Sequence, residues 1–151
     1  MEVKSEKTND KIEKKNDELL AFKGRFLSAI GKRKTAIAQV RLYKNGSGII
    51  AVNGVKISKY FSYGDMAKIS QLLKLVGLSR ELNFSVKTEG GGKKAQAQAV
   101  LLGMAKALID FNKELRPSIK AKGWLTRDSR KKERKKPGLK RARRAPQWQK
   151  R

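Results

Sequence analysis

The sequence predicts an α+β domain in which one small β-sheet is covered on one face by helices. Two segments, 36–43 and 82–87, alternate apolar and polar residues with the period of two that strands show. Two others, 65–76 and 94–111, space apolar residues three and four apart, as helices do. Strands and helices do not repeat as regular βαβ units, so a parallel α/β fold is not favoured. With 151 residues, 38% of them hydrophobic, the chain has apolar material for one modest core.

The first strands are predicted from alternation on either side of a turn. Apolar and polar residues alternate through 36–43 and resume at 49–52 after a stretch rich in Asn and Gly. Because these residues tolerate the positive φ angles of tight turns, we predict a hairpin between the two segments. A second turn is predicted at Asn53 and Gly54, from which residues 55–60 lead out.

The first predicted helix covers residues 65–76. Asp65 is placed to cap its N-terminus, and Gly77 is placed to end it. A strand is predicted at 82–87, where every second residue is apolar, and it runs into the three glycines at 90–92.

A longer helix is predicted from about 94 to 111, because five alanines favour helix and large apolar residues form a stripe along it. A short third helix is predicted near 112–122. Pro117 would lie in its first turn, where the missing N–H costs little.

The two ends of the chain differ from this core in composition. Residues 1–24 carry six lysines, six acids and few apolar side chains, so we expect a disordered or transiently helical extension. Residues 122–151 carry fourteen Lys or Arg residues against two acids, Asp128 and Glu133, and predict an extended basic tail. These acids are expected to form local ion pairs or to orient neighbouring arginines toward phosphates. The globular domain is predicted to occupy 25–121.

The charge balance points to a polyanionic partner. Thirty-eight Lys and Arg residues against 13 acids give a net charge of +25, which is self-repelling in a compact free protein. A phosphate backbone supplies the neutralising charge. The tail lacks the apolar face that an interfacial helix buries in lipid, so no membrane partner is expected.

Composition also excludes several classes of chemistry. The chain has no cysteine and no histidine, which removes thiolate sites, the commonest general base and the commonest zinc ligand. No two acids of the domain or tail have the spacing of a paired-carboxylate site. We therefore expect no enzyme activity, cofactor or metal. The mixed-charge start lacks the apolar core of a secretory signal, and no apolar run is long enough to span a membrane, so the protein is expected to stay where it is made.

Two short basic clusters are candidates for contact with nucleic acid. Lys32, Arg33 and Lys34 precede the first predicted strand; the alternative is a solvated charge cluster, and the net charge favours contact with a phosphate backbone. Lys93 and Lys94 follow the three glycines at a helix N-terminus, where anions are favoured. The spacing is not that of a nucleotide-hydrolysing loop, and a plain glycine turn is the alternative.

Two tryptophans lie in basic surroundings. Trp124 is predicted to anchor the start of the tail against the domain. The tail around Trp148 offers no core, so this ring is a candidate for stacking on a base or ribose.

Several motifs occur together in the second half of the chain. The passage from Gly90 to Leu108 combines three glycines, small residues at Ala99 and Gly103, and a final Ala-Lys-Ala-Leu. The tail contains Gly-Trp-Leu-Thr-Arg-Asp-Ser-Arg at 123–130, Glu-Arg-Lys-Lys at 133–136 and Ala-Arg-Arg-Ala-Pro-Gln at 142–147, while Gly-Lys-Arg-Lys stands at 31–34. Together these closely resemble the pattern of the ninth small-subunit ribosomal protein family, bacterial type, over residues 27–151.

The resemblance implies a fold and partners that the residue pattern alone does not supply. The implied fold is similar to domain two of ribosomal protein S-five, with a left-handed βαβ connection, and it is seated in the head of the small subunit. The implied partners are small-subunit rRNA, the anticodon stem-loop of peptidyl-site tRNA and neighbouring head proteins, with no homo-oligomer. The implied location is a cytoplasmic ribosome, with an organellar ribosome left open.

The resemblance also assigns roles to basic residues. Lys150 and Arg151 match the tRNA-contacting end, preceded by Gln149 where the family usually has serine. The expected rRNA-binding residues, from the charge clusters and the resemblance together, are Lys32, Arg33, Lys34, Lys93, Lys94, Arg116, Arg127, Arg130, Arg134, Lys135, Lys136, Lys140, Arg141, Arg143 and Arg144.

Two other classes of function remain open at this point. A freestanding nucleic-acid packaging protein or RNA chaperone would account for the charge equally well. The Lys150 and Arg151 end and the glycine-to-helix unit distinguish the ribosomal reading, because a nonspecific packager needs neither. An enzyme is the third class, which turnover of a nucleotide substrate would support.

Overall fold

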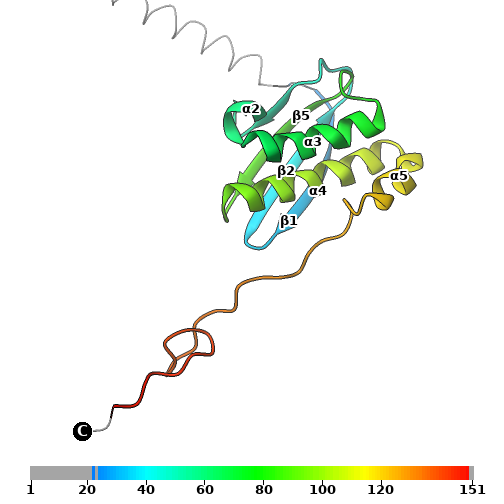
Figure 1. The fold of residues 1–151 in the computed structure, drawn as a ribbon. Helices are drawn as coiled ribbons and strands as arrows, with labels where there is room; N and C mark the ends of the chain where they lie inside the picture. The colour runs from blue at the N-terminus through cyan, green and yellow to red at the C-terminus, as the bar shows by residue number, and fades with distance from the viewer. Residues whose placement is uncertain (1–21, 23, 150–151) are drawn as a thin grey trace, which may run out of the picture.

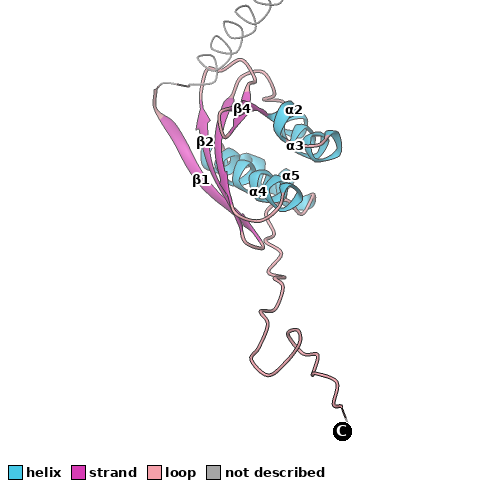
Figure 2. Ribbon diagram, turned by 90° about the vertical axis from the view of Figure 1, so that its left-hand side faces the viewer, coloured by secondary structure: helices cyan, strands magenta, loops and turns pink. Residues whose placement is uncertain are grey.

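The computed structural model describes residue 22 and residues 24–149. It is an α+β structure with one five-stranded sheet and two main helices, α3 (Tyr63–Val76) and α4 (Lys93–Phe111). Figure 1 shows both helices on the same face of the sheet, and Figure 2 shows the sheet and the helices as two layers. The predicted fold class is confirmed. The predicted extension, 1–24, lies almost wholly outside the described residues.

The strands lie in the order β1 (Phe26–Arg33), β2 (Ala36–Tyr43), β5 (Asn83–Glu89), β3 (Ile50–Val52) and β4 (Val55–Lys56). Neighbouring strands are antiparallel except β3 and β5, which run parallel. The chain between these two passes through β4 and α3 before it returns to the sheet. The left-handed sense of this connection, which the family resemblance implies, stays a prediction.

The hairpin predicted between β2 and β3 is wrong. Both segments are strands, but β5 lies between them and pairs with each. The loop after β2 binds the beginning of β5 instead. The Gly46 amide donates to the Glu81 carbonyl oxygen at 2.7 Å, and the Ser47 and Ile49 amides each donate to the side-chain oxygen of Asn83 at 2.9 Å.

The hairpin partner of β2 is β1, a strand that the sequence analysis did not predict. A two-residue turn, Lys34 and Thr35, joins the two strands. β1 carries apolar side chains on both faces, because Phe26 and Ile30 are about half exposed while Leu27 packs against the core. The alternation that marks a strand is therefore lost. Gly31 contacts α4, so residues 27, 29 and 31 face the helices and the exposed side chains of Phe26 and Ile30 lie on the opposite face of the sheet.

The other elements agree with the predictions to within a few residues. α3 begins after Ser62 rather than at Asp65, and the Ser62 hydroxyl donates to the Asp65 carboxylate at 3.0 Å. The helix ends at Gly77 in the left-handed conformation, as predicted. The third helical segment is a 3-10 turn, η1 (Lys113–Leu115), followed by α5 (Arg116–Ala121) with proline in its first turn. A single-turn helix, α2 (Ile57–Tyr60), lies within the segment predicted to lead out of the second turn.

The core lies between the sheet and the helices, and α4 approaches β1 closely. A Cβ atom added to Gly31 would overlap the Ala99 carbonyl oxygen and stand 2.5 Å from the Gly103 nitrogen. One added to Gly103 would stand 2.6 Å from a methyl group of Val40. Two glycines therefore allow the backbone of the helix to rest on the backbone of the strand. The largest fully buried side chains are Phe84, Leu42, Ile69, Leu72, Met104, Leu108, Ile119, Val40, Val52 and Val100.

Candidate nucleic-acid interface

The fold brings the two basic clusters of the domain to one end of the sheet. Gly90 and Gly91 have φ angles of 69° and 63°, in the left-handed region that favours glycine. A Cβ at Gly90 would stand 2.6 Å from the Thr35 carbonyl oxygen, and one at Gly91 would stand 3.1 Å from the Ala36 Cβ. The glycine loop thus packs against the β1–β2 turn. Two predicted clusters that are about sixty residues apart in the sequence become neighbours in space.

The lysines of these clusters have different surroundings. Lys32, Lys34 and Lys94 are exposed. The Lys93 ammonium lies 3.2 Å from the centroid of the Tyr60 ring, a cation–π contact that fixes this side chain beside the loop. The end of the domain therefore presents several exposed cations and one that is held in place.

A hydrogen-bonded network lies beneath the glycine loop and supports it. The Tyr60 hydroxyl donates to the Gln96 side-chain oxygen at 3.0 Å, and the Gln96 amide group donates to the Gly90 carbonyl oxygen at 3.1 Å. The Asn53 side chain donates to the Tyr60 hydroxyl at 3.2 Å and to the Thr88 carbonyl oxygen at 3.1 Å. Hydrogen bonding from Thr88, and the nearby Lys93 ammonium, lower the pKa of Tyr60.

This network is not predictable from the sequence, because its members come from four separate elements. The only local signal was an asparagine at a predicted turn, and Asn53 does have a positive φ of 49° there. The network joins the β3–β4 turn and α2 to β5 and the first turn of α4. These hydrogen bonds tie the end of the domain that carries the glycine loop to four elements.

Arg33 behaves differently from its basic neighbours. Its side chain is only 13% exposed and turns toward the beginning of the tail. Its guanidinium donates to the Gln98 side-chain oxygen at 2.8 Å, to the carbonyl oxygens of Asp128 and Arg130 at 3.3 and 3.2 Å, and to the Asp128 carboxylate at 2.6 Å. Arg33 thus connects the end of β1, the exposed side of α4 and the tail.

Asp128 completes this arrangement from the tail side. Besides Arg33, its carboxylate accepts hydrogen bonds from the Arg130 amide at 2.9 Å and from the Arg130 guanidinium, the shortest at 2.7 Å. The hydrogen bonds of Arg130, with the Arg33 charge, hold the pKa of Asp128 well below its usual range. We call Arg33, Asp128 and Arg130 the tail clasp.

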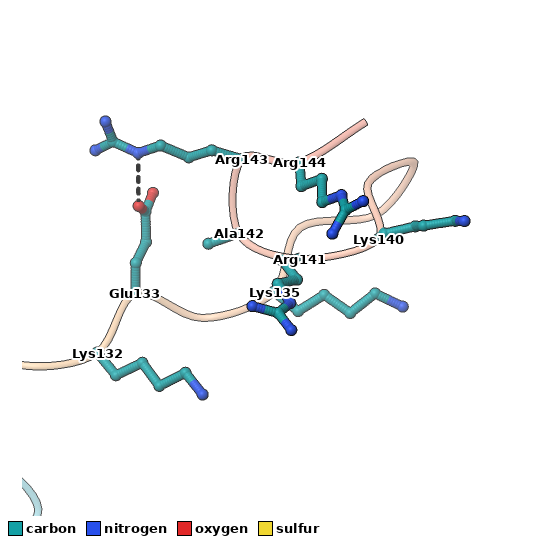
Figure 3. A pocket seen from close by; sticks show the side chains of 8 residues that line it. All are labelled: Lys132, Glu133, Lys135, Lys140, Arg141, Ala142, Arg143 and Arg144. Atoms are coloured by element: carbon teal, nitrogen blue, oxygen red, sulfur yellow. Dashed lines mark hydrogen bonds and ion pairs between the residues drawn. The ribbon is translucent and has the colours of Figure 1, made fainter. Parts of the chain in front are cut away.

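Beyond the clasp the tail forms a loop lined by cations. Glu133 pairs with the Lys136 ammonium at 2.7 Å and with the Arg143 guanidinium at 2.9 Å, and both partners, Lys136 first, lower its pKa. The Lys140 amide donates to the Arg144 carbonyl oxygen at 2.7 Å and closes the loop. Figure 3 shows basic side chains radiating from this loop, which borders a hollow of about 720 Å³. The acids of the tail do form ion pairs, with Arg33, Arg130, Lys136 and Arg143.

The remaining candidates lie on the surface of the domain and tail. Trp124 is partly buried and packs against the core, as predicted, whereas Trp148 is 81% exposed. Among the described residues beyond Ala121, none is assigned to a helix or strand. Lys150 and Arg151 lie outside the described residues. Exposed predicted rRNA contacts are Arg116, Arg127, Arg130, Arg134, Lys135, Lys136, Lys140, Arg141, Arg143 and Arg144.

Over residues 22 and 24–149, no group of three or more acids is placed to hold a metal ion. Within the same part of the chain, no helix combines the length and apolar character needed to cross a membrane.

Comparison with known proteins places these features in a family. A family model described as ribosomal protein S9/S16 matches residues 31–151. The chain is 48% identical over 123 residues to the small ribosomal subunit protein uS9c of Gracilaria tenuistipitata var. liui, covering 80% of this chain and 89% of that protein. It is 47% identical to uS9 of Trichormus variabilis, with 80% and 88% covered, and 44% identical over 126 residues to uS9 of Amoebophilus asiaticus, with 83% and 98% covered.

Proposed function

The chain belongs to the ribosomal protein S9/S16 family, and from this premise we propose that its domain binds rRNA in the head of the small subunit while its tail reaches the peptidyl-site tRNA. The protein is a structural constituent of the small ribosomal subunit and not an enzyme, and its partners include rRNA and other ribosomal proteins. Its relatives include bacterial uS9 and uS9c, which is consistent with a ribosome in the cytoplasm or in an organelle.

The observation that best supports rRNA binding is the packing of the glycine loop on the β1–β2 turn. It places Lys32, Lys34, Lys93 and Lys94 at one end of a rigid domain, from which the tail also departs. Contacts of this kind neutralise phosphates and fix the orientation of a protein on RNA without reading its sequence. The domain, residues 25–121, is therefore the part that docks on rRNA.

Figure 1 shows the described part of the tail, residues 122–149, running away from the domain. The sixteen residues 136–151 span at most roughly 50 Å at about 3.3 Å each, and the loop closed between Lys140 and Arg144 takes up part of this length. This reach is what allows Lys150 and Arg151 to approach the tRNA backbone from a domain seated on rRNA. The exposed ring of Trp148 would stack on a base or ribose along that path.

Charge reversal in the tail loop tests the proposal. Changing Lys135, Lys136, Arg143 and Arg144 to Glu should block incorporation into small subunits, because cations that line the rRNA path become anions. The matched control changes four exposed lysines elsewhere to Glu, at positions 59, 68, 74 and 113, with the same effect on net charge. Normal occupancy of the tail variant in purified subunits would refute the tail contact. Equal loss in both variants would show that only total charge matters.

Sedimentation separates this function from that of a freestanding packaging protein. Tagged protein from a lysate should migrate stoichiometrically with small subunits at high salt and should lose that position after ribonuclease treatment. Smearing across all nucleic acid, with release by salt, would favour packaging instead.

A further inference from the structure

In the tail clasp, Arg33 donates most of its hydrogen bonds to its own chain, although it stands between two exposed lysines. A guanidinium has five N–H donors, and Arg33 directs its Nε, Nη1 and Nη2 groups to four acceptors of its own chain. Its positive charge is paired with Asp128 at 2.6 Å. Little of this side chain is left for a phosphate.

The acceptors come from both sides of the junction between domain and tail. Gln98 belongs to α4, whereas the carbonyl oxygens of Asp128 and Arg130 and the Asp128 carboxylate belong to the tail. Arg33 itself ends β1, the strand against which α4 is packed. Because the Arg33 guanidinium is planar and binds all of these acceptors, it fixes both the position and the direction of the tail where the tail leaves the domain.

We propose that Arg33 and Asp128 position the tail relative to the domain, and that Arg33 is not itself an rRNA contact. The inference rests on the proposed function, because a positioned tail matters only if the tail binds rRNA. It reassigns one residue that the family resemblance places among the rRNA-facing positions. Lys32 and Lys34, which flank Arg33 and are exposed, remain the proposed rRNA contacts at the β1–β2 turn.

The energetic reason is pre-organisation. A tail free to pivot at residue 128 would have to be ordered when it meets RNA, and that cost is subtracted from the binding free energy. With the clasp closed, the first residues of the tail already leave the domain in one direction. Opening the clasp should therefore weaken binding about three- to tenfold without removing any phosphate contact.

Two substitutions distinguish a positioning role of Arg33 from direct contact between Arg33 and rRNA, because the two roles predict different changes in rRNA affinity. Asp128→Asn removes a negative charge from a basic surface; direct contact predicts equal or stronger rRNA binding, whereas positioning predicts weaker binding. Arg33→Lys keeps the positive charge but lacks the planar guanidinium that donates to several acceptors at once. Direct contact predicts nearly normal binding for this variant, whereas positioning predicts a loss close to that of Arg33→Ala.

The salt dependence of binding to small-subunit rRNA supplies a third criterion. Each phosphate contact contributes about 0.7–0.9 to the slope of log affinity against log salt. Arg33→Ala should lower affinity but leave this slope unchanged, while the control variant Lys34→Ala should reduce the slope by about that amount. A slope reduced equally in both variants would overturn the assignment.

Distance measurements on the free, full-length protein test the clasp without RNA. The chain contains no native cysteine, so spin labels can be placed at Gln71→Cys on α3 and at Lys131→Cys just past the clasp, both at exposed positions. The distance distribution should be narrow in this labelled protein and broad after Asp128→Asn. Equal widths would overturn the positioning role. Because no RNA is present, this result stands even if rRNA binding by the tail is itself refuted.

Discussion

The close approach of α4 to β1 makes a sharp prediction for Gly31→Ala. The added methyl group would overlap the Ala99 carbonyl oxygen and lie 2.5 Å from the Gly103 nitrogen. Both are backbone atoms of a helix that packs on β1 and β2, so no side-chain rotation can relieve the clash. The helix itself must move away from the sheet.

The expected cost follows from what that movement loses. Overpacking a core typically costs about 1–3 kcal/mol, and a gap of about 0.5–1 Å forfeits a quarter to a half of each dispersion contact across it. Replacing glycine also reduces the entropy of the unfolded chain, which is worth about 0.4–1 kcal/mol in the opposite direction and does not offset the clash. We expect a net loss of about 2–3 kcal/mol, at the upper end of the overpacking range because both clashing atoms belong to the backbone, or on the order of 10–20 °C in Tm for a domain of this size.

The assay is urea and thermal unfolding followed by far-UV circular dichroism. Gly64→Ala is the matched control, because it makes the same chemical change in α3 where an added Cβ would meet no atom of another element within 4 Å. It should be neutral or stabilising by up to about 1 kcal/mol. A loss below about 1 kcal/mol for Gly31→Ala would refute the close backbone contact.

Three further predictions address the tail and the network. Deletion of residues 149–151 should weaken tRNA binding in the peptidyl site while subunit assembly stays nearly intact; equal tRNA dissociation rates from truncated and full-length ribosomes would contradict the proposed contact. Tyr60→Phe leaves Gln96 and Asn53 without a shared partner and should cost about 1–2 kcal/mol in urea unfolding at pH 7, so an unchanged midpoint would show that the network does not stabilise the loop. Because the pKa of Asp128 is lowered, its ion pairs are fully present above the ordinary carboxyl pKa and are lost only as pH falls through the lowered value. The distance distribution across the clasp should thus stay narrow at about pH 4, and broadening between pH 6 and 4 would count against the pairing.

Most element types were predictable from the sequence because they depend on local pattern; β1 is the exception, since its apolar side chains lie on both faces and hide the alternation. Gly77 ends α3 by its left-handed conformation, and the proline of α5 falls in the first turn, as capping rules require. The apolar stripe of α4 is real and reaches the core at Val100, Met104 and Leu108. Each of these features is decided by residues within a few positions of one another.

Strand partners were not predictable, because long-range contacts decide them. An Asn and Gly turn after β2 looks like a hairpin, yet its amides bind Glu81 and Asn83, more than thirty residues away. The same holds for the site. Nothing in the sequence of the triplet at 32–34 distinguishes Arg33 from the lysines. Its ion pair with Asp128, almost a hundred residues away, is what sets it apart in the structure.

The central place of β5 in the sheet bears on the order in which the domain is completed during synthesis. The β1–β2 and β3–β4 pairs use only neighbouring sequence, but two-stranded pairs are marginal alone, and nothing in the sheet joins them until residues 83–89 have been made. The contact of α4 with β1 comes later still. Chains grow from the N-terminus, so the polycationic tail emerges only after every element that anchors it has been synthesised.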